Sequence, residues 1–252
     1  MKHLIGLGFG VLALATAGAA SAADLPVRGA PPPRAPVFTP AGYNWTGFYI
    51  GANGGGAWSH KCWAFVAPIT GVVSPEGCHN ATGGAAGGQI GFNWQTGPLV
   101  FGVEFAGDWT SLRGQNLSLF FTAPQNTNRT KVDGILAATG RLGYAFDAAM
   151  LYVKGGGAWV SDKYTAFNTA TLVINSSASE TRTGWTVGGG FEYGFTPNWS
   201  FAVEYDHYDF GTKGVNFTGL FTGVDRIGQK VDLVTGRINY RFGGGGPLVA
   251  RY

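Results

Sequence analysis

The feature that most constrains the fold is the alternation of side-chain type over residues 183–210. Up to a turn at 196–198, one parity is aromatic or aliphatic, and the other is glycine, small or charged. The alternation resumes from Trp199 to Tyr205. Because period two is the mark of a β-strand, this segment predicts a hairpin with a short turn. One face of the hairpin is apolar and needs a cover of protein or lipid.

The same alternation recurs along the chain from residue 45. Six further stretches show it: 46–57, 85–95, 99–111, 132–146, 150–162 and 229–242. Short turns follow the second, fourth and sixth strands. Long connections follow the other strands except the last, at 57–84, 112–131, 163–182 and 211–228. This pattern predicts an all-β fold, an eight-stranded antiparallel up-and-down transmembrane β-barrel, with the long connections outside the cell and both termini in the periplasm.

A soluble lipocalin-like barrel is the structural alternative, but such a barrel keeps its apolar residues inside. Here the charged parity can face only a lumen or water, and aromatic residues gather at the strand ends, as they do at a membrane interface. The pattern therefore favours an integral protein of the cell outer membrane. Its expected partners are outer-membrane lipid and lipopolysaccharide.

The two ends of the chain differ from the alternating part. Residues 1–22 combine the basic Lys2, an apolar run and a small-residue cleavage site, which predicts a signal peptide. Residues 23–44 are rich in proline and predict an extended periplasmic tail that could bind peptidoglycan. The barrel is expected over 45–242, followed by a glycine-rich C-terminal extension at 243–252.

Composition excludes one class of function. The formal net charge is only +3, and charged residues make up 12% of the chain. A charge this small and scattered does not make a nucleic-acid surface. No glycine run has the lysine and hydroxyl that follow a phosphate-binding loop, so no cofactor is expected.

Cys62 and Cys78 are the only cysteines, and both lie in the first long connection. An exported chain with two cysteines is expected to form a disulfide, here one that constrains a loop outside the barrel wall. His60 and His79 flank the pair, so a His/Cys metal site is the alternative. The spacing matches no tight ligand pair, and no metal site is predicted.

Strand parity directs a group of charged side chains into the lumen. The predicted lumen residues are Glu104, Asp108, Arg141, Lys154, Glu192, Glu204, Asp206, Arg237 and Arg241. Unpaired charges in such a space are costly, so these residues are expected to pair. They could line a small ion-selective porin, or they could close the barrel as a structural network. The second interpretation is favoured because eight strands leave room only for side chains.

A lipid-modifying barrel enzyme is a further alternative, and His207 is its candidate residue. Parity points His207 outward near the outer end of its strand. With a serine hydroxyl and a carboxylate in reach, it could attack a lipid ester. A histidine beside aromatic residues is more often an interface residue, and no catalytic residue is predicted.

Four stretches carry a family resemblance: W-T-G-F-Y-I-G-A-N-G-G-G at 45–56, and residues 87–105, 140–157 and 184–211. Together they resemble the small outer-membrane immunogenic proteins of alphaproteobacteria. The resemblance implies a surface-exposed barrel, sometimes described as porin-like, without catalytic residues. Such barrels usually end at an aromatic residue, and either Phe242 or Tyr252 could serve as this assembly signal.

Overall fold

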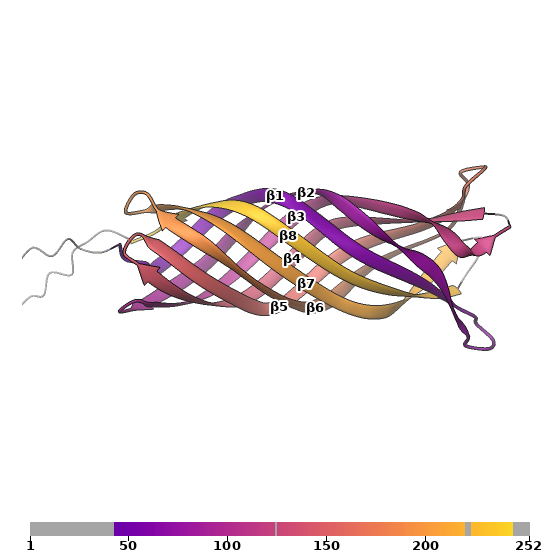
Figure 1. Cartoon of the computed structure of the whole chain (residues 1–252), viewed down its shortest axis with the longest axis horizontal. Helices are drawn as coiled ribbons and strands as arrows, with labels where there is room; N and C mark the ends of the chain where they lie inside the picture. Colours follow the sequence, from indigo (N-terminus) through magenta and orange to yellow (C-terminus); the bar gives the residue numbers. More distant parts are fainter. Residues whose placement is uncertain (1–42, 124, 220–222, 244–252) are drawn as a thin grey trace, which may run out of the picture. The chain divides into compact units, whose positions relative to one another are not determined.

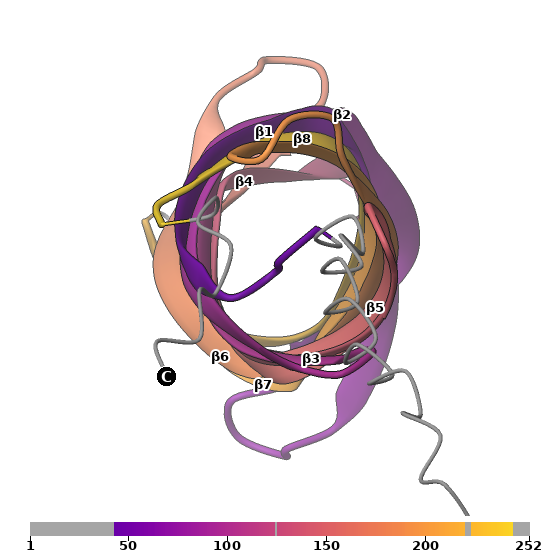
Figure 2. The same ribbon diagram turned by 90° about the vertical axis from the view of Figure 1, so that its left-hand side faces the viewer.

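The computed structural model describes residues 43–123, 125–219 and 223–243. Within these ranges the chain forms a closed antiparallel barrel in which each strand pairs with its neighbours in sequence and β8 pairs with β1 (Figures 1 and 2). The strands are β1 (Gly47–Val66), β2 (Val73–Thr96), β3 (Leu99–Thr122), β4 (Gln125–Phe146), β5 (Ala149–Asn168), β6 (Ile174–Gly194), β7 (Trp199–Gly219) and β8 (Gly223–Arg241). The predicted fold class is confirmed.

Alternation along each strand gives the barrel an apolar outer face. On β3, for example, Phe101, Val103 and Phe105 are exposed, whereas Val100 and Glu104 are buried. Each strand contributes exposed apolar side chains to a band that begins at the short turns. Tryptophans on four strands mark the far edge of this band, and we call them the tryptophan row: Trp58, Trp109, Trp159 and Trp185. We treat the segments between the short turns and this row as membrane-spanning.

No helix in the described ranges is long and apolar enough to cross a membrane.

Two glycines leave room for tyrosines to reach across the interior. Gly91 lies opposite Tyr49, and Gly190 lies opposite Tyr152. A Cβ atom added at Gly91 would lie 2.5 Å from the hydroxyl of Tyr49, and one at Gly190 would lie 2.6 Å from that of Tyr152. A larger residue at either position would therefore displace a tyrosine from the lumen.

The short turns lie where the sequence predicts them, at 97–98, 147–148 and 195–198. Gly97 and Asp147 both have a φ of 58°, a left-handed conformation suited to tight turns.

The prediction of long loops at the opposite end was wrong, because the strands run far past the tryptophan row. β1 continues to Val66 and β2 begins at Val73, so only residues 67–72 connect them. Most of the predicted loop at 57–84 is therefore barrel wall, and the same holds at 112–131, 163–182 and 211–228. Backbone pairing between the strands continues there. The apolar alternation ends because no lipid contacts this part of the wall and requires an apolar outer face.

The described chain begins inside the barrel opening, where its indigo start crosses the ring in Figure 2. Trp45 is fully buried there, its backbone N–H donates to Gln95 Oε1 at 2.7 Å, and its indole N–H donates to the carbonyl of Asp147 at 3.3 Å. Phe242 follows the end of β8 and donates its N–H to the carbonyl of Phe48 at 2.8 Å. The signal peptide, residues 23–42 of the tail, and 244–252 with Tyr252 lie outside the described residues.

Substitution of Gly190 by alanine tests the close packing behind the tyrosines. The new Cβ would lie 2.6 Å from both the hydroxyl of Tyr152 and the carbonyl oxygen of Val203. We expect the free energy of unfolding in urea to fall by about 1–3 kcal/mol, as for other overpacked interiors. Gly56→Ala is the matched control, because a Cβ there meets no atom within 4 Å. Equal stability of the two variants would contradict this packing.

Candidate functional site

Two carboxylates and two cations form a closed network at the centre of the lumen. Lys154 Nζ lies 2.6 Å from Glu204 Oε1 and 3.3 Å from Glu104 Oε1. Arg237 spans the same two carboxylates, with Nη2 at 2.9 Å from Glu104 Oε1 and Nη1 bonded to Glu204 Oε2. Each cation therefore joins β3 to β7 across the interior. All four side chains are almost completely buried.

Two tyrosines complete the hydrogen bonding of these carboxylates. Tyr49 donates its hydroxyl to Glu104 Oε2 at 2.7 Å, and Tyr152 donates to Glu204 Oε2 at 2.6 Å. Every oxygen of the two carboxylates thus has a partner. A complete set of partners is what makes buried charges tolerable at low dielectric.

Arg141 and Glu192 form a further ion pair beside this network. Ser200 Oγ and Asn239 Nδ2 donate to Glu192 Oε1 at 2.5 and 3.0 Å. The guanidinium of Arg141 lies 3.4 Å from the ring centre of Tyr152, which connects the two clusters. The bundle of contacts therefore extends from β3 to β8 around the interior.

The structure brings most of the predicted lumen residues together, but among the described residues Asp108 joins no ion pair, and Arg241 lies apart. Asp206 joins the centre through Lys154 Nζ, at 3.3 Å from its Oδ2. Asp108 is buried, yet its Oδ1 has no hydrogen-bond partner among the described residues. Arg241 lies at the end near the short turns, where its guanidinium is 4.3 Å from the ring centre of Tyr43 and 5.1 Å from that of Trp45.

Sequence reasoning missed a second polar layer nearer the opposite end. Lys61 Nζ lies 2.8 Å from Asp162 Oδ1, and both side chains are fully buried. Arg182 donates to the carbonyl of Ile227 at 2.5 Å and to Gln229 Oε1 at 3.3 Å. These residues lie at the ends of the predicted strands or in the predicted loops. The signal that could have found Lys61 is the parity of β1, which continues past Ala57 through Ser59.

Apolar layers separate and cover the polar ones. One interior cluster includes Leu112, Ile135, Val160, Tyr208 and Leu233. A second, near the far opening, consists of Trp63, Tyr164, Val215, Phe217 and Ile227. The third, near the short turns, contains Trp45, Val100, Ala145, Met150 and Tyr152. Side chains therefore fill the interior along much of its length, as expected for eight strands.

Beyond the tryptophan row, two acids, Glu76 and Asp225, have raised pKa values. Burial, and then the charge of Glu76, raise the pKa of Asp225 to about 7. Burial also raises the pKa of Glu76, and hydrogen bonds from Asn128 and Ser118 oppose this effect. Asn128 Nδ2 lies 2.8 Å from Glu76 Oε2.

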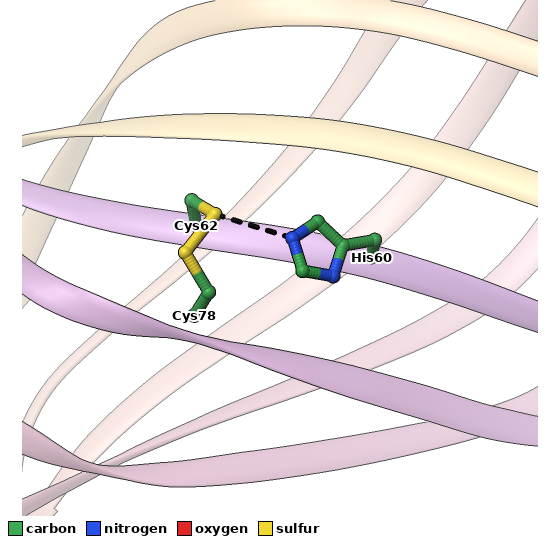
Figure 3. Close-up of side chains that lie close together, drawn as sticks. All are labelled: His60, Cys62 and Cys78. Atoms are coloured by element: carbon green, nitrogen blue, oxygen red, sulfur yellow. Dashed lines mark hydrogen bonds between the residues drawn. A yellow bond between two sulfur atoms is a disulfide. The ribbon is translucent and has the colours of Figure 1, made fainter.

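The disulfide joins Cys62 and Cys78, with an Sγ–Sγ distance of 2.02 Å (Figure 3). The two residues are directly paired across β1 and β2, so the expectation of a bond outside the barrel wall was wrong. The physical reason is the extension of both strands past the tryptophan row, which carries the wall to this position.

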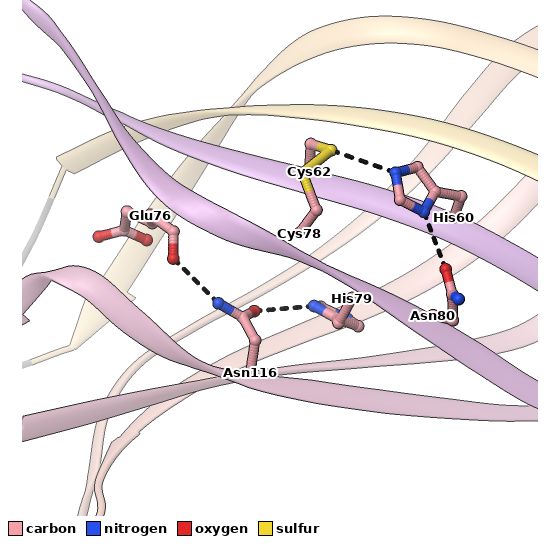
Figure 4. The surroundings of a disulfide bond; sticks show 7 residues. All are labelled: His60, Cys62, Glu76, Cys78, His79, Asn80 and Asn116. Carbon is pink, nitrogen blue, oxygen red and sulfur yellow. Dashed lines mark hydrogen bonds between the residues drawn. A yellow bond between two sulfur atoms is a disulfide. The ribbon is translucent and has the colours of Figure 1, made fainter.

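Two histidines flank the disulfide but face different surroundings (Figure 4). His60 Nε2 lies 3.5 Å from Cys62 Sγ, and its Nδ1 lies 2.8 Å from Asn80 Oδ1. His79 is largely buried and hydrogen-bonds Asn116 Oδ1 at 2.8 Å. His60 and the two sulfurs are close enough together to hold a metal ion. In the disulfide, however, neither sulfur is the thiolate that zinc takes.

His207 has an acidic partner on the outer face. Its Nδ1 lies 2.7 Å from Asp232 Oδ1, and the hydroxyl of Tyr205 donates to the same oxygen at 2.7 Å. The imidazole ring centre lies 5.9 Å from that of Trp185. Within the described ranges, no serine hydroxyl is hydrogen-bonded to His207.

The closed barrel, its apolar outer band and its filled interior define an integral β-barrel membrane protein. The family model for the outer membrane protein beta-barrel domain matches residues 9–227, so the chain belongs to this family. The protein is therefore one of the outer membrane.

Relatives and solved structures agree with this assignment. The chain is 33% identical to the 31 kDa outer-membrane immunogenic protein of Brucella melitensis, over 90% of this chain and 95% of that protein. It is 33% identical to the 22 kDa outer membrane protein of Rhizobium leguminosarum, over 79% and 80%. The crystal structure of OprG from Pseudomonas aeruginosa matches 79% of this chain and 98% of its own with a TM-score of 0.50, at 12% identity, and shows the fold alone.

Replacing Cys62 and Cys78 together by serine tests the role of the disulfide. In the chain-entropy model, a closed loop of this length contributes about 3 kcal/mol, so we expect unfolding free energy to fall by up to that amount. The barrel should still fold, because β1 and β2 remain paired from Gly47 to Lys61. Urea unfolding of both proteins without reductant measures the loss. Free thiols in the oxidised wild-type protein would contradict the bond.

The pH dependence of stability tests the environment of Asp225. A carboxyl whose folded pKa of about 7 lies above its ordinary 3.8 stabilises the fold fully below the lower value, and this stability is lost as pH rises to the higher one. Thermal unfolding midpoints should therefore decline less from pH 4 to 7 in Asp225→Asn than in the wild type. Adding Glu76→Gln should flatten the profile further. Parallel profiles would contradict the raised pKa.

Proposed function

We propose that the protein is a structural and surface component of the outer membrane whose lumen is closed. The observation that carries this proposal is the central network, in which Lys154 and Arg237 bridge Glu104 and Glu204 across the interior. Apolar clusters lie on both sides of it along the lumen. An ion on its way through would have to break paired charges and cross apolar layers, both of which oppose conduction.

The proposed orientation places the long strand extensions outside the cell and the short turns in the periplasm. Up-and-down barrels have short periplasmic turns, which supports this choice. The extensions would then be accessible at the cell surface. The Brucella relative is named as immunogenic, and we propose a similar surface exposure here. Contact with lipopolysaccharide belongs to the same proposal. Binding of peptidoglycan through residues 23–44 stays a prediction.

A porin and an enzyme remain the alternatives to this function. The porin requires that the network in the lumen open or rearrange. The enzyme would use His207 and Asp232, which are hydrogen-bonded on the outer face. Tyr205 rather than serine supplies the nearby hydroxyl. The relatives reported above are named as outer-membrane proteins and not as enzymes. We therefore propose no catalytic role.

Arg237→Ala separates the structural role from the porin role. Removal of one partner leaves Glu104 and Glu204 with buried, poorly compensated charge, so we expect a loss of about 3–5 kcal/mol in unfolding free energy. Arg226→Ala is the matched control, because Arg226 lies on the same strand and is exposed. Both proteins and the wild type are refolded into vesicles for urea unfolding, and into planar bilayers for conductance.

The closed-lumen proposal expects the wild type to show no large, long-lived openings in the planar bilayer. Arg237→Ala should change stability far more than conductance. Long-lived, ion-selective openings of the wild type, with selectivity shifted by Arg237→Ala, would instead establish the porin.

A further inference from the structure

A group of basic side chains lies on the outer wall beyond the tryptophan row, and we call it the cationic patch: Arg113, Arg129, Lys131 and Lys163. Arg113 on β3 is directly opposite Lys131 on β4, which is directly opposite Lys163 on β5. Adjacent strands are about 4.8 Å apart, so three cations stand side by side on the wall. Like charges in directly opposite positions are unfavourable.

One carboxylate offsets part of this repulsion. Asp133 Oδ1 lies 2.6 Å from Lys131 Nζ, and its Oδ2 lies 3.2 Å from Lys163 Nζ. Among the described residues, Arg113 has no ion-pair or side-chain hydrogen-bond partner. The patch thus sets four cations against one carboxylate, and the described residues leave its excess positive charge uncompensated.

Arg129 is held in place by neutral groups. Its Nε and Nη2 each lie 3.3 Å from Gln115 Oε1, and its guanidinium lies 4.7 Å from the ring centre of Phe167. These contacts orient the guanidinium of Arg129 without neutralising its positive charge. An open groove is lined by Arg113, Gly114, Gln115, Arg129 and Lys131. The cations therefore line a shared space that an anion can enter.

The height of the patch identifies the layer that it faces. Arg113 lies four residues beyond Trp109 on β3, and Lys163 lies four residues beyond Trp159 on β5. Four residues span about 13 Å along a strand, or roughly 10 Å along the membrane normal at a usual barrel tilt. Tryptophans lie at the level of the headgroups. In the proposed orientation, the patch consequently faces the sugar and phosphate layer just outside the acyl chains.

The cationic patch is confined to one side of the barrel. On the wall formed by β7 and β8, the exposed cations are Lys213, Arg226 and Lys230. Lys213 Nζ lies 2.7 Å from Glu180 Oε1, and Lys230 Nζ lies 3.7 Å from Asp209 Oδ2, so two of these three cations have acidic partners and Arg226 is a single exposed cation. General attraction to an anionic surface would not require a grouped set of cations on three adjacent strands.

We propose that the cationic patch binds phosphate groups of lipopolysaccharide in the outer leaflet. Arg113 and Arg129 offer planar forks that bind phosphate oxygens in pairs, and Lys131 and Lys163 add point charges. A bound phosphate lowers the repulsion between the opposed cations. The proposal rests on the proposed orientation, in which the extended strand ends lie outside the cell.

A binding measurement with full-length barrels in neutral detergent micelles tests the site. Purified deep-rough lipopolysaccharide is titrated against the wild type, and against a variant that combines Arg113→Gln, Arg129→Gln and Lys131→Gln. Each basic residue near an anionic headgroup contributes about fivefold in affinity, so the triple variant should bind about a hundredfold more weakly. Lys230→Gln is the control, and its affinity should match the wild type. Unfolding midpoints without lipid verify that every variant is folded.

The source of the phosphate is tested in parallel arms. Dephosphorylated lipopolysaccharide should bind the wild type about as weakly as intact lipopolysaccharide binds the triple variant. Equal binding of the phosphorylated and dephosphorylated lipid would overturn the proposal, as would an unchanged affinity of the triple variant. Complete displacement of lipopolysaccharide by inorganic phosphate at equal concentration would identify a site for free phosphate instead.

The orientation is tested separately with Thr70→Cys, in the exposed connection between β1 and β2. A membrane-impermeant maleimide should label this cysteine on intact cells. Labelling only after lysis would overturn the proposed orientation. The cationic patch would then not face the outer leaflet, even if it binds lipopolysaccharide in micelles. Labelling on intact cells without binding in micelles would reject the phosphate site alone.

Discussion

Closure of the backbone hydrogen-bond ladder is the constraint on which the rest of this structure depends. In hydrocarbon, an unpaired N–H or C=O group costs several kcal/mol, so strands can cross only when the last one pairs with the first. Here β8 meets β1 from Tyr49 to Val66. Once the ring is closed, each side chain has two directions left, outward to lipid or inward to a narrow lumen. Period-two alternation follows directly from that choice.

The narrow lumen then determines how its charges are arranged. Side chains from opposite walls meet at the centre, so a carboxylate such as Glu104 must be neutralised within the protein. The chain meets this requirement for Glu104 and Glu204 with two cations that each contact both acids, and with tyrosines admitted by Gly91 and Gly190. Apolar layers between the charged ones add packing without polar groups to satisfy. If the lumen is closed as proposed, stability and impermeability arise from the same side chains.

The sequence predicts the membrane-spanning part well because lipid imposes a rule on every second residue. The hairpin at 183–210 and the inward parity of Glu104, Arg141 and Arg237 could be recognised for this reason. Beyond the tryptophan row, the outer face meets polar surroundings and the rule ends: on β3, Ser111, Arg113 and Gln115 face outward, opposite Thr110 and Leu112. Such stretches look like loops when apolar alternation is the guide, so it misses the strand extensions, and only the inward parity of β1 that continues through Ser59 points to Lys61 of the Lys61–Asp162 pair.

The position of the disulfide bears on the order of assembly. Cys62 and Cys78 belong to neighbouring strands of one hairpin, so their bond requires no contact between β1 and β8. The two cysteines of the hairpin can therefore be oxidised in the periplasm before the barrel closes. A covalent link at that stage aligns β1 with β2 before β1 accepts its second neighbour. When β8 finally pairs with β1, the register of β1 with β2 is already fixed. Fewer barrels with mispaired strands can then form.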